Sequence, residues 1–181
     1  MPIRSFEGIH PSVGERVYID DMATVVGDVV MGDDVSIWPY CAIRGDVRHI
    51  RIGARSNVQD NTVLHVTHDG PYTPGGMPLL IGEDVTIGHA AILHACTVED
   101  ACLIGMGSVV LDGARIGKNA MVAAGAVVTP GKVVESGTLW AGNPARMLRR
   151  LSETEIEALY YSAKNYVRLK NRYLREQPSC G

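Results

Sequence analysis

The sequence predicts a mainly β protein, a single-stranded parallel β-helix of hexapeptide repeats in residues 1–150, followed by one C-terminal α-helix. Aliphatic residues recur every six positions, and a small or branched residue stands four positions after most of them. Such a fixed short period is typical of a β-helix, in which each strand forms one side of a prism and no coil buries its apolar face alone. The aliphatic guide residues are Ile19, Val25, Met31, Ile37, Ile43, Ile52, Val58, Leu64, Ile81, Ile87, Leu93, Val98, Ile104, Val110, Ile116, Val122, Val128 and Val134.

Three hexapeptides complete one triangular coil, so residues one coil apart share a face at the spacing of neighbouring strands, roughly 4.8 Å. We name the sides that begin at Ile43, Ile52 and Val58 faces A, B and C. Face A returns at Leu64. A loop of about a dozen residues, rich in glycine and proline, then interrupts the repeat, and irregular structure is expected there. Face A returns once more at Leu93.

Three histidines fall at defined places in this repeat. His65 and His94 each directly follow a face A guide residue in successive coils, so we expect them to be strand neighbours, with Arg44 in the same column. His89 lies two places after the face C guide Ile87 and therefore belongs to a different side of the prism. A cyclic trimer that sets face A of one chain against face C of the next would bring all three together.

Converging imidazoles predict a metal site. Three neutral imidazoles leave a tetrahedral cation with one open position, which is the pattern of catalytic zinc. Fe²⁺, Co²⁺ and Ni²⁺ accept the same ligands, so the sequence does not distinguish among these metals. Alternatively, the histidines are polar residues on the rim of a β-helix. The repetition of histidine at equivalent positions favours metal binding.

Several short segments resemble those of the γ-class carbonic anhydrases and the bacterial hexapeptide-repeat proteins of the YrdA and PaaY type. They are Arg44-Gly45-Asp46, Ser56-Asn57-Val58-Gln59-Asp60, Leu64-His65, Ile87-Gly88-His89 and Leu93-His94. The resemblance extends over essentially the whole chain. It implies a left-handed β-helix, a homotrimer, and the reversible hydration of carbon dioxide to bicarbonate by a metal-bound hydroxide at the trimer interface.

The resemblance also implies roles for individual residues. His65 and His94 would be zinc ligands together with His89 of a neighbouring chain, and Gln59 would hydrogen-bond the metal-bound water. Gln59 also suits the cap of a corner turn, and only its place one coil below the His89 position favours a role in the site.

Three charged residues flank the histidines. The resemblance pairs Arg44 with Asp60 across the subunit interface and lets Asp46 help to hold the trimer. An Arg–Asp pair at a partly buried seam can form bidentate hydrogen bonds that fix register. The alternative is a solvated charged face.

The chain departs from the archetype of the family where that archetype carries glutamates for proton transfer. Val47 follows the Arg44-Gly45-Asp46 motif, and His68 stands three residues after His65. His68 can serve as a proton relay because imidazole titrates near neutrality. It is equally well explained as an ordinary loop histidine.

The segment after the repeats predicts a helix from about Ser152 to Arg175, within the region 151–175, and a flexible tail at residues 176–181. Ser152 and Glu155 form a capping box. An approximately helical apolar stripe follows at Ile156, Leu159, Tyr160, Ala163, Tyr166, Val167 and Leu174. The resemblance implies that Tyr166 reaches the metal pocket, although a tyrosine on such a stripe also suits the core.

Composition narrows the partners and the compartment. The net charge of −3 gives no basic footprint, which argues against nucleic acid as a partner. An apolar leader and a membrane-spanning stretch are not apparent, so we expect a cytoplasmic protein.

The four cysteines do not suggest a metal framework. Cys41 and Cys102 occupy inward small-residue positions, Cys96 differs in phase from the histidine column, and Cys180 lies in the tail. We therefore expect a reducing compartment without disulfides.

Two other functions fit the same fold. Gly142-Asn143-Pro144-Ala145-Arg146 resembles the terminal-coil motif of acyltransferases that use acyl-coenzyme A and a single histidine as general base. One base requires one histidine, whereas three clustered histidines favour a ligand set. The second alternative is a catalytically weak trimeric protein that binds the metal only as an interface clip.

Overall fold

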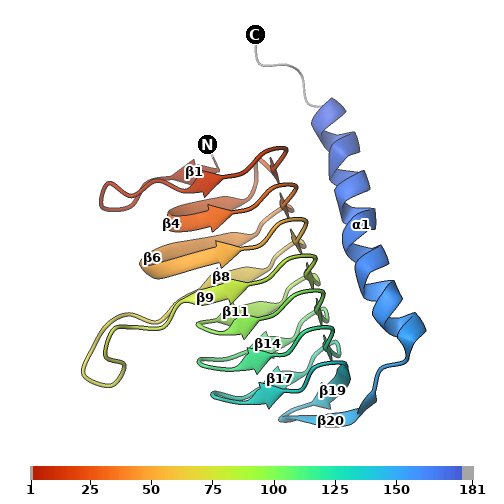
Figure 1. The fold of residues 1–181 in the computed structure, drawn as a ribbon. Coiled ribbons are helices and arrows are strands. Elements are labelled where there is room, and N and C mark those ends of the chain that lie inside the picture. The colour runs from red at the N-terminus through yellow and green to blue at the C-terminus, as the bar shows by residue number, and fades with distance from the viewer. Residues whose placement is uncertain (1, 177–181) are drawn as a thin grey trace.

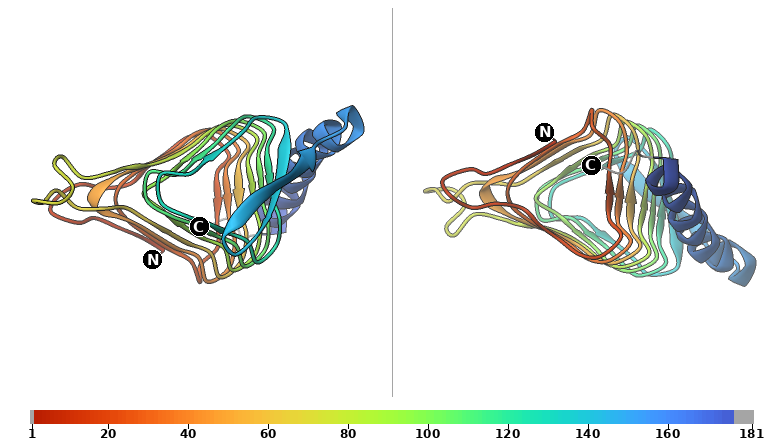
Figure 2. Two further views of the ribbon diagram at one scale, coloured as in Figure 1. Left: turned by 90° about the horizontal axis from the view of Figure 1, so that it is seen from below. Right: turned by 90° about the horizontal axis from the view of Figure 1, so that it is seen from above.

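The computed structural model describes residues 2–176 and shows a tall stack of triangular coils with one helix along its side (Figure 1). The protein is a left-handed parallel β-helix of about 8 turns, which confirms the predicted fold class. Viewed along its axis, the stack has a triangular cross-section, and α1 lies outside one of the three sides (Figure 2).

Faces A and B form one 12-stranded sheet because two long strands, β4 (Thr24–Met31) and β6 (Ala42–Ile52), turn the corner between them. Face A continues with β8 (Val63–His65), β11 (Ile92–His94), β14 (Val109–Val110) and β17 (Val127–Val128). Face B continues with β9 (Leu79–Ile81), β12 (Thr97–Val98), β15 (Arg115–Ile116) and β18 (Val133–Val134), while β1 (Ile3–Arg4) and β2 (Ser12–Val13) pair with β4.

Face C is a separate 8-stranded sheet. Its strands are β3 (Tyr18–Ile19), β5 (Ser36–Ile37), β7 (Asn57–Val58), β10 (Thr86–Ile87), β13 (Leu103–Ile104), β16 (Met121–Val122), β19 (Thr138–Gly142) and β20 (Ala145–Arg150). Every pairing in it is parallel except that of β19 with β20, which is antiparallel.

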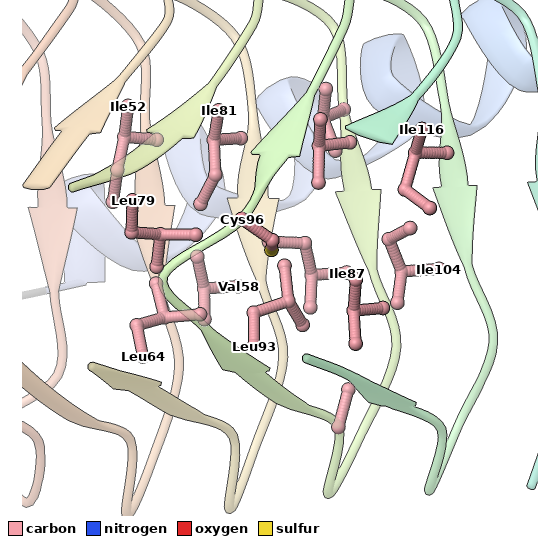
Figure 3. Packing of buried hydrophobic residues seen from close by; sticks show 14 of the residues in the cluster. Ile52, Val58, Leu64, Leu79, Ile81, Ile87, Leu93, Cys96, Ile104 and Ile116 are labelled. Carbon is pink, nitrogen blue, oxygen red and sulfur yellow. The ribbon is translucent and has the colours of Figure 1, made fainter. Parts of the chain in front are cut away.

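The strand register confirms the predicted faces. Leu64 pairs with Leu93 on face A, and Val58 pairs with Ile87 on face C, so the long loop leaves the order of faces unchanged. The guide residues of successive coils stack inside the prism, as the columns of labelled side chains in Figure 3 show. Burial of these aliphatic side chains is the main favourable contribution to the stability of the coils.

The corners of the prism are formed by glycine in some coils and by other residues in others. Equivalent corner residues between face C and face A are Tyr40, Asn61, Ala90, Gly107 and Gly125, all with positive φ. The upper coils therefore make this turn with non-glycine residues, at a local conformational cost, and the lower coils make it with glycine. Glycine content alone does not locate the corners in the coils that hold the histidines.

The helix α1 spans Glu153–Glu176 and begins with the predicted capping box. The Glu155 amide donates to Ser152 Oγ (3.2 Å), and the Ser152 amide donates to Glu155 Oε2 (2.9 Å). Helix α1 contacts strands of face C. Helix α1, the one helix in residues 2–176, is too polar to span a bilayer. Residues 177–181, where most of the predicted tail and Cys180 fall, lie outside the described residues.

The predicted apolar stripe of α1 is partly wrong. Leu159 and Ala163 are buried as expected, but Tyr160 is 39% exposed and Lys170 is fully buried. The Lys170 ammonium donates to Asp34 Oδ1 (2.7 Å) and to the Arg16 carbonyl oxygen (2.5 Å). Because these acceptors replace water, a lysine can stand where the apolar pattern alone predicts no charge.

The cysteines in the described residues are buried free thiols. Burial raises the pKa of Cys41 to about 11 and that of Cys102 to about 12. Burial also raises the pKa of Cys96. The three thiols are therefore protonated at neutral pH and poorly nucleophilic.

Candidate metal centre

The centre begins with two histidines at the ends of neighbouring strands on face A. His65 ends β8, His94 ends β11, and the two residues are register partners, as the repeat predicts. His65 Nδ1 lies 3.1 Å from His94 Nε2, and the ring centroids are 5.1 Å apart. Two ring nitrogens of one chain therefore face each other at the surface of the prism.

Each of these two rings also contacts a carboxylate through its other nitrogen. His94 Nδ1 lies 2.7 Å from Asp112 Oδ1, and His65 Nε2 lies 3.1 Å from Asp46 Oδ1. A carboxylate accepts a hydrogen bond, so we assign the N–H of each neutral imidazole to the nitrogen beside it. The two facing nitrogens then both carry lone pairs, which repel unless a cation lies between them.

The spacing of the facing nitrogens fits a metal ion. A tetrahedral zinc ion with Zn–N distances of roughly 2.0–2.1 Å separates two ligand nitrogens by roughly 3.3 Å, close to the observed 3.1 Å. Burial lowers the pKa of His65, although the neighbouring Asp46 carboxylate opposes this effect. His65 is consequently neutral at pH 7, as a metal ligand must be.

His89 lies at the corner that follows β10 of face C. Its Nδ1 is 2.8 Å from Asp60 Oδ2, which leaves Nε2 available as a lone-pair donor. Among residues 2–176 of the single chain, no three His, Cys, Asp or Glu side chains gather in a metal-binding cluster. This agrees with the expectation that His89 does not join the other two histidines within one chain.

Asp112 is a site residue that the sequence reasoning missed. Burial acts to raise its pKa, but hydrogen bonds from Thr67 and His94 outweigh burial and hold the pKa below its usual value. Asp112 is therefore an anion at neutral pH. It lies 18 residues after His94, one place beyond the position that the strand register sets beside His94, so a search for carboxylates within one place of each histidine's column would have found it.

Asp46 contacts residues of its own chain. Its carboxylate accepts hydrogen bonds from Arg44 and His65, and these lower its pKa although burial acts in the opposite direction. The Arg44 side chain remains 52% exposed. The predicted pairing of Arg44 with Asp60 involves two chains and stays a prediction.

A cavity of about 560 Å³ lies beside His89, between face C and α1. Gln59, His89 and Tyr166 line it together, so three residues singled out from the sequence share one space. Most of the other lining residues are apolar, including Leu103, Met106, Met121 and Leu139. Tyr166 also packs edge-on against Trp38, with ring centroids 5.8 Å apart.

His68 lies in the loop between β8 and β9, which projects from the stack in Figure 1. Its side chain is exposed. An exposed position suits proton exchange with solvent, but its role as a relay stays a prediction.

Comparisons with known proteins agree on the family. The family model for the bacterial transferase hexapeptide (six repeats) matches residues 10–45 and 95–130. The chain is similar to Protein YrdA of Escherichia coli (strain K12), with 54% identity over 95% of this chain and 94% of the relative. It is also similar to a carbonic anhydrase of Geobacillus kaustophilus, with 42% identity over 98% of this chain and 96% of the relative.

A solved structure has the same fold. The crystal structure of a hexapeptide transferase family protein from Anaplasma phagocytophilum matches with a TM-score of 0.86 and 44% identity. The match covers 94% of this chain and 97% of the other. The names of the relatives thus include both carbonic anhydrase and transferase. The geometry of the site is therefore needed to choose between these two activities.

Proposed function

Because the chain belongs to the hexapeptide-repeat family that includes YrdA and the γ carbonic anhydrases, we propose that it catalyses the reversible hydration of carbon dioxide to bicarbonate. The observation that carries the proposal is the pair of facing nitrogens, Nδ1 of His65 and Nε2 of His94, each in an imidazole bound by its own carboxylate. These two histidines and the partner subunit's His89 are the proposed ligands of a Zn²⁺ ion. Fe²⁺, Co²⁺ or Ni²⁺ would also be accepted.

The proposed assembly is a cyclic homotrimer. On face A, Val63 and Ile92 stand just before the two histidine-bearing strand ends and are 38% and 42% exposed. Apolar side chains beside a polar centre are typical of a surface that another chain covers. A neighbouring corner that covers them would also deliver its His89 to the facing nitrogens, and closed cyclic symmetry would repeat the site at each interface.

The metal would supply hydroxide at neutral pH by lowering the pKa of a water to about 7, a value established for carbonic anhydrase and not inferred from this structure. The chain's own residues would do the remaining work. The Gln59 carboxamide, which donates to Asn57 Oδ1 (3.2 Å), would orient the reacting water. Tyr166 would limit the space around carbon dioxide, and His68 would pass the released proton to solvent.

Arg44 and Asp60 would work between subunits. The guanidinium of Arg44 would pair with the partner's Asp60 and so fix the register of the two chains. That register decides whether the partner's His89 reaches the metal, so both residues influence catalysis through the geometry of the ligands.

The transferase alternative predicts a different use of the histidines. A general base needs one imidazole with an acceptor nitrogen that is free to take a proton. Here two acceptor nitrogens face each other at 3.1 Å, an arrangement that suits a cation better than a base. A non-catalytic trimer that binds the metal only to hold its subunits together would use the same ligands. Only a rate measurement distinguishes it from an enzyme.

Stopped-flow hydration of carbon dioxide tests the proposal on zinc-loaded protein of known metal content. We expect the wild type to be active, and His94→Ala to lose both zinc and activity. His10→Ala removes a histidine outside the proposed site and serves as the matched control. Equal rates in the wild type and His94→Ala would contradict the enzymatic proposal, and acetyl-coenzyme A binding by metal-free protein would favour the transferase.

A further inference from the structure

We propose that Asp112 and Thr67 act as a positioning pair that sets the metal affinity of His94 and couples it to the loop of residues 66–78. The inference rests on the proposed metal site, and it assigns a function to two residues that the site's ligand set does not contain. Neither residue is a ligand, and both act through His94.

The first step of the argument is that both oxygens of Asp112 are engaged. Oδ1 accepts from His94 Nδ1 (2.7 Å), and Oδ2 accepts from the Thr67 hydroxyl. A carboxylate with two hydrogen bonds in different directions cannot rotate freely. The His94 ring is therefore fixed both in tautomer and in orientation, with Nε2 directed toward His65.

The second step concerns the place of Thr67. It comes two residues after His65, and its backbone pairs with Met77 through two hydrogen bonds, Thr67 N to Met77 O (3.1 Å) and Met77 N to Thr67 O (3.0 Å). These bonds close the base of the loop. The side chain of Thr67 thus connects the loop base to Asp112, which is 45 residues away in the sequence.

Gly76 makes this closure possible. A Cβ atom at Gly76 would lie 2.6 Å from the Thr67 carbonyl oxygen, and the residue has φ of +64°. Only glycine meets both conditions without displacing the Thr67 backbone. The close packing at the base of the loop therefore fixes the position of the Thr67 backbone.

The third step is chemical. A carboxylate that accepts the distal N–H of a metal-binding imidazole raises its basicity and holds its orientation, and loss of such a partner typically costs 10- to 100-fold in metal affinity. Asp112 has the required contact on the required nitrogen. The hydroxyl of Thr67 contributes by orienting Asp112, so its removal should have a smaller effect.

Zinc affinity measured by competition with a chromophoric chelator tests the pair. We expect Asp112→Asn to raise the zinc Kd about 10- to 100-fold and Thr67→Val to raise it less. Thr67→Val should also speed amide hydrogen exchange in residues 66–78. Asp100→Asn is the matched control, because it makes the same charge change at a corner carboxylate that accepts from the Glu83 amide (3.0 Å).

Three results would overturn the inference. If Asp112→Asn binds zinc as tightly as Asp100→Asn while His94→Ala does not, the positioning pair is wrong and the proposed ligand set stands. If His94→Ala also binds as the wild type does, the ligand set itself is wrong. Should Asp112→Asn fail to fold by thermal melting, Thr67→Val decides, and unchanged affinity and exchange in that variant would reject the pair.

Discussion

Two regions of the molecule bring nitrogen groups and carboxylates together, with different outcomes. Where α1 covers face C, the ammonium of Lys170 is fully buried and donates to Asp34 and to the Arg16 carbonyl of the same chain. On face A, His65 and His94 are partly exposed and point two acceptor nitrogens at each other. The first arrangement is complete in one chain, and the second presents two acceptor nitrogens at a spacing that suits a cation.

The two regions separate a contact that stabilises the fold from one that prepares a binding site. The helix that carries Lys170 packs on the coils through aromatic pairs as well, with Trp38 and Tyr173 ring centroids 5.1 Å apart. Around the histidines, carboxylates hold the rings, but no side chain among residues 2–176 donates a hydrogen bond to the facing nitrogens. A satisfied buried network stabilises the fold, whereas an oriented but unsatisfied one is prepared for a ligand.

The largest effect should come from stranding the buried charge. We expect Asp34→Ala to lower the free energy of unfolding by about 3–5 kcal/mol, because Lys170 would keep a buried charge without its partner. Urea unfolding of metal-free protein measures it. Asp112→Ala, which removes a partly exposed carboxylate, is the comparison. An equal loss in both variants would mean that the two regions do not differ as described.

Zinc should stabilise only a chain with an intact centre. At a free zinc concentration of 100 times Kd, the expected gain is about 2.7 kcal/mol. We expect this gain in the wild type and in Asp34→Ala, and none in His94→Ala, when thermal unfolding is followed with and without zinc. Stabilisation of His94→Ala by zinc would place the cation elsewhere.

The start of α1 should contribute less than either network. Ser152→Ala removes the side-chain acceptor for the Glu155 amide and should cost about 1 kcal/mol. Chemical denaturation measures the loss, and zinc affinity should stay at the wild-type value because the cap lies outside the metal centre. A change in zinc affinity would show that helix docking and the centre are coupled.

The smallest effect should be a pH dependence of the face C network. Hydrogen bonding to Arg16 lowers the pKa of Asp34 despite its burial, and Lys170 adds to this lowering. A carboxyl whose folded pKa is depressed stabilises the fold above its unfolded pKa, near 3.8, and this stabilisation is lost as pH falls through the folded pKa.

Urea unfolding of metal-free protein at pH 5 and pH 3 measures this dependence. We expect the wild type to lose more stability between these values than Asp34→Asn, which has no such carboxyl. Equal losses in the two proteins would show that Asp34 does not titrate differently on folding.

Much of the architecture follows from the sequence because the period is physical. A six-residue repeat of aliphatic guides fixes the faces, and counting coils through the long loop places His65 beside His94 in the correct register. The same counting places His89 on another side. These inferences depend only on strand geometry, which insertions at corners do not disturb.

Other features follow from contacts that no repeat encodes. Lys170 is buried because Asp34 and a carbonyl accept its hydrogen bonds, which an apolar pattern does not reveal. Asp112 was missed because Leu93 pairs with Val110, 17 positions later, so the carboxylate is displaced by one place from the histidine column. Ala90 takes a corner conformation that glycine usually supplies.

Mixing two inactive variants tests most directly whether neighbouring chains share one ion. His89→Ala retains the face A histidines, and His94→Ala retains the corner histidine. If equal amounts of the two variants assemble at random into closed trimers, about three trimers in four contain both variants. Each of these mixed trimers has one intact interface out of three, so about one site in four should recover zinc and activity. Neither variant alone should recover any. If the mixture binds no more zinc than the separate variants, the ligands do not come from two chains.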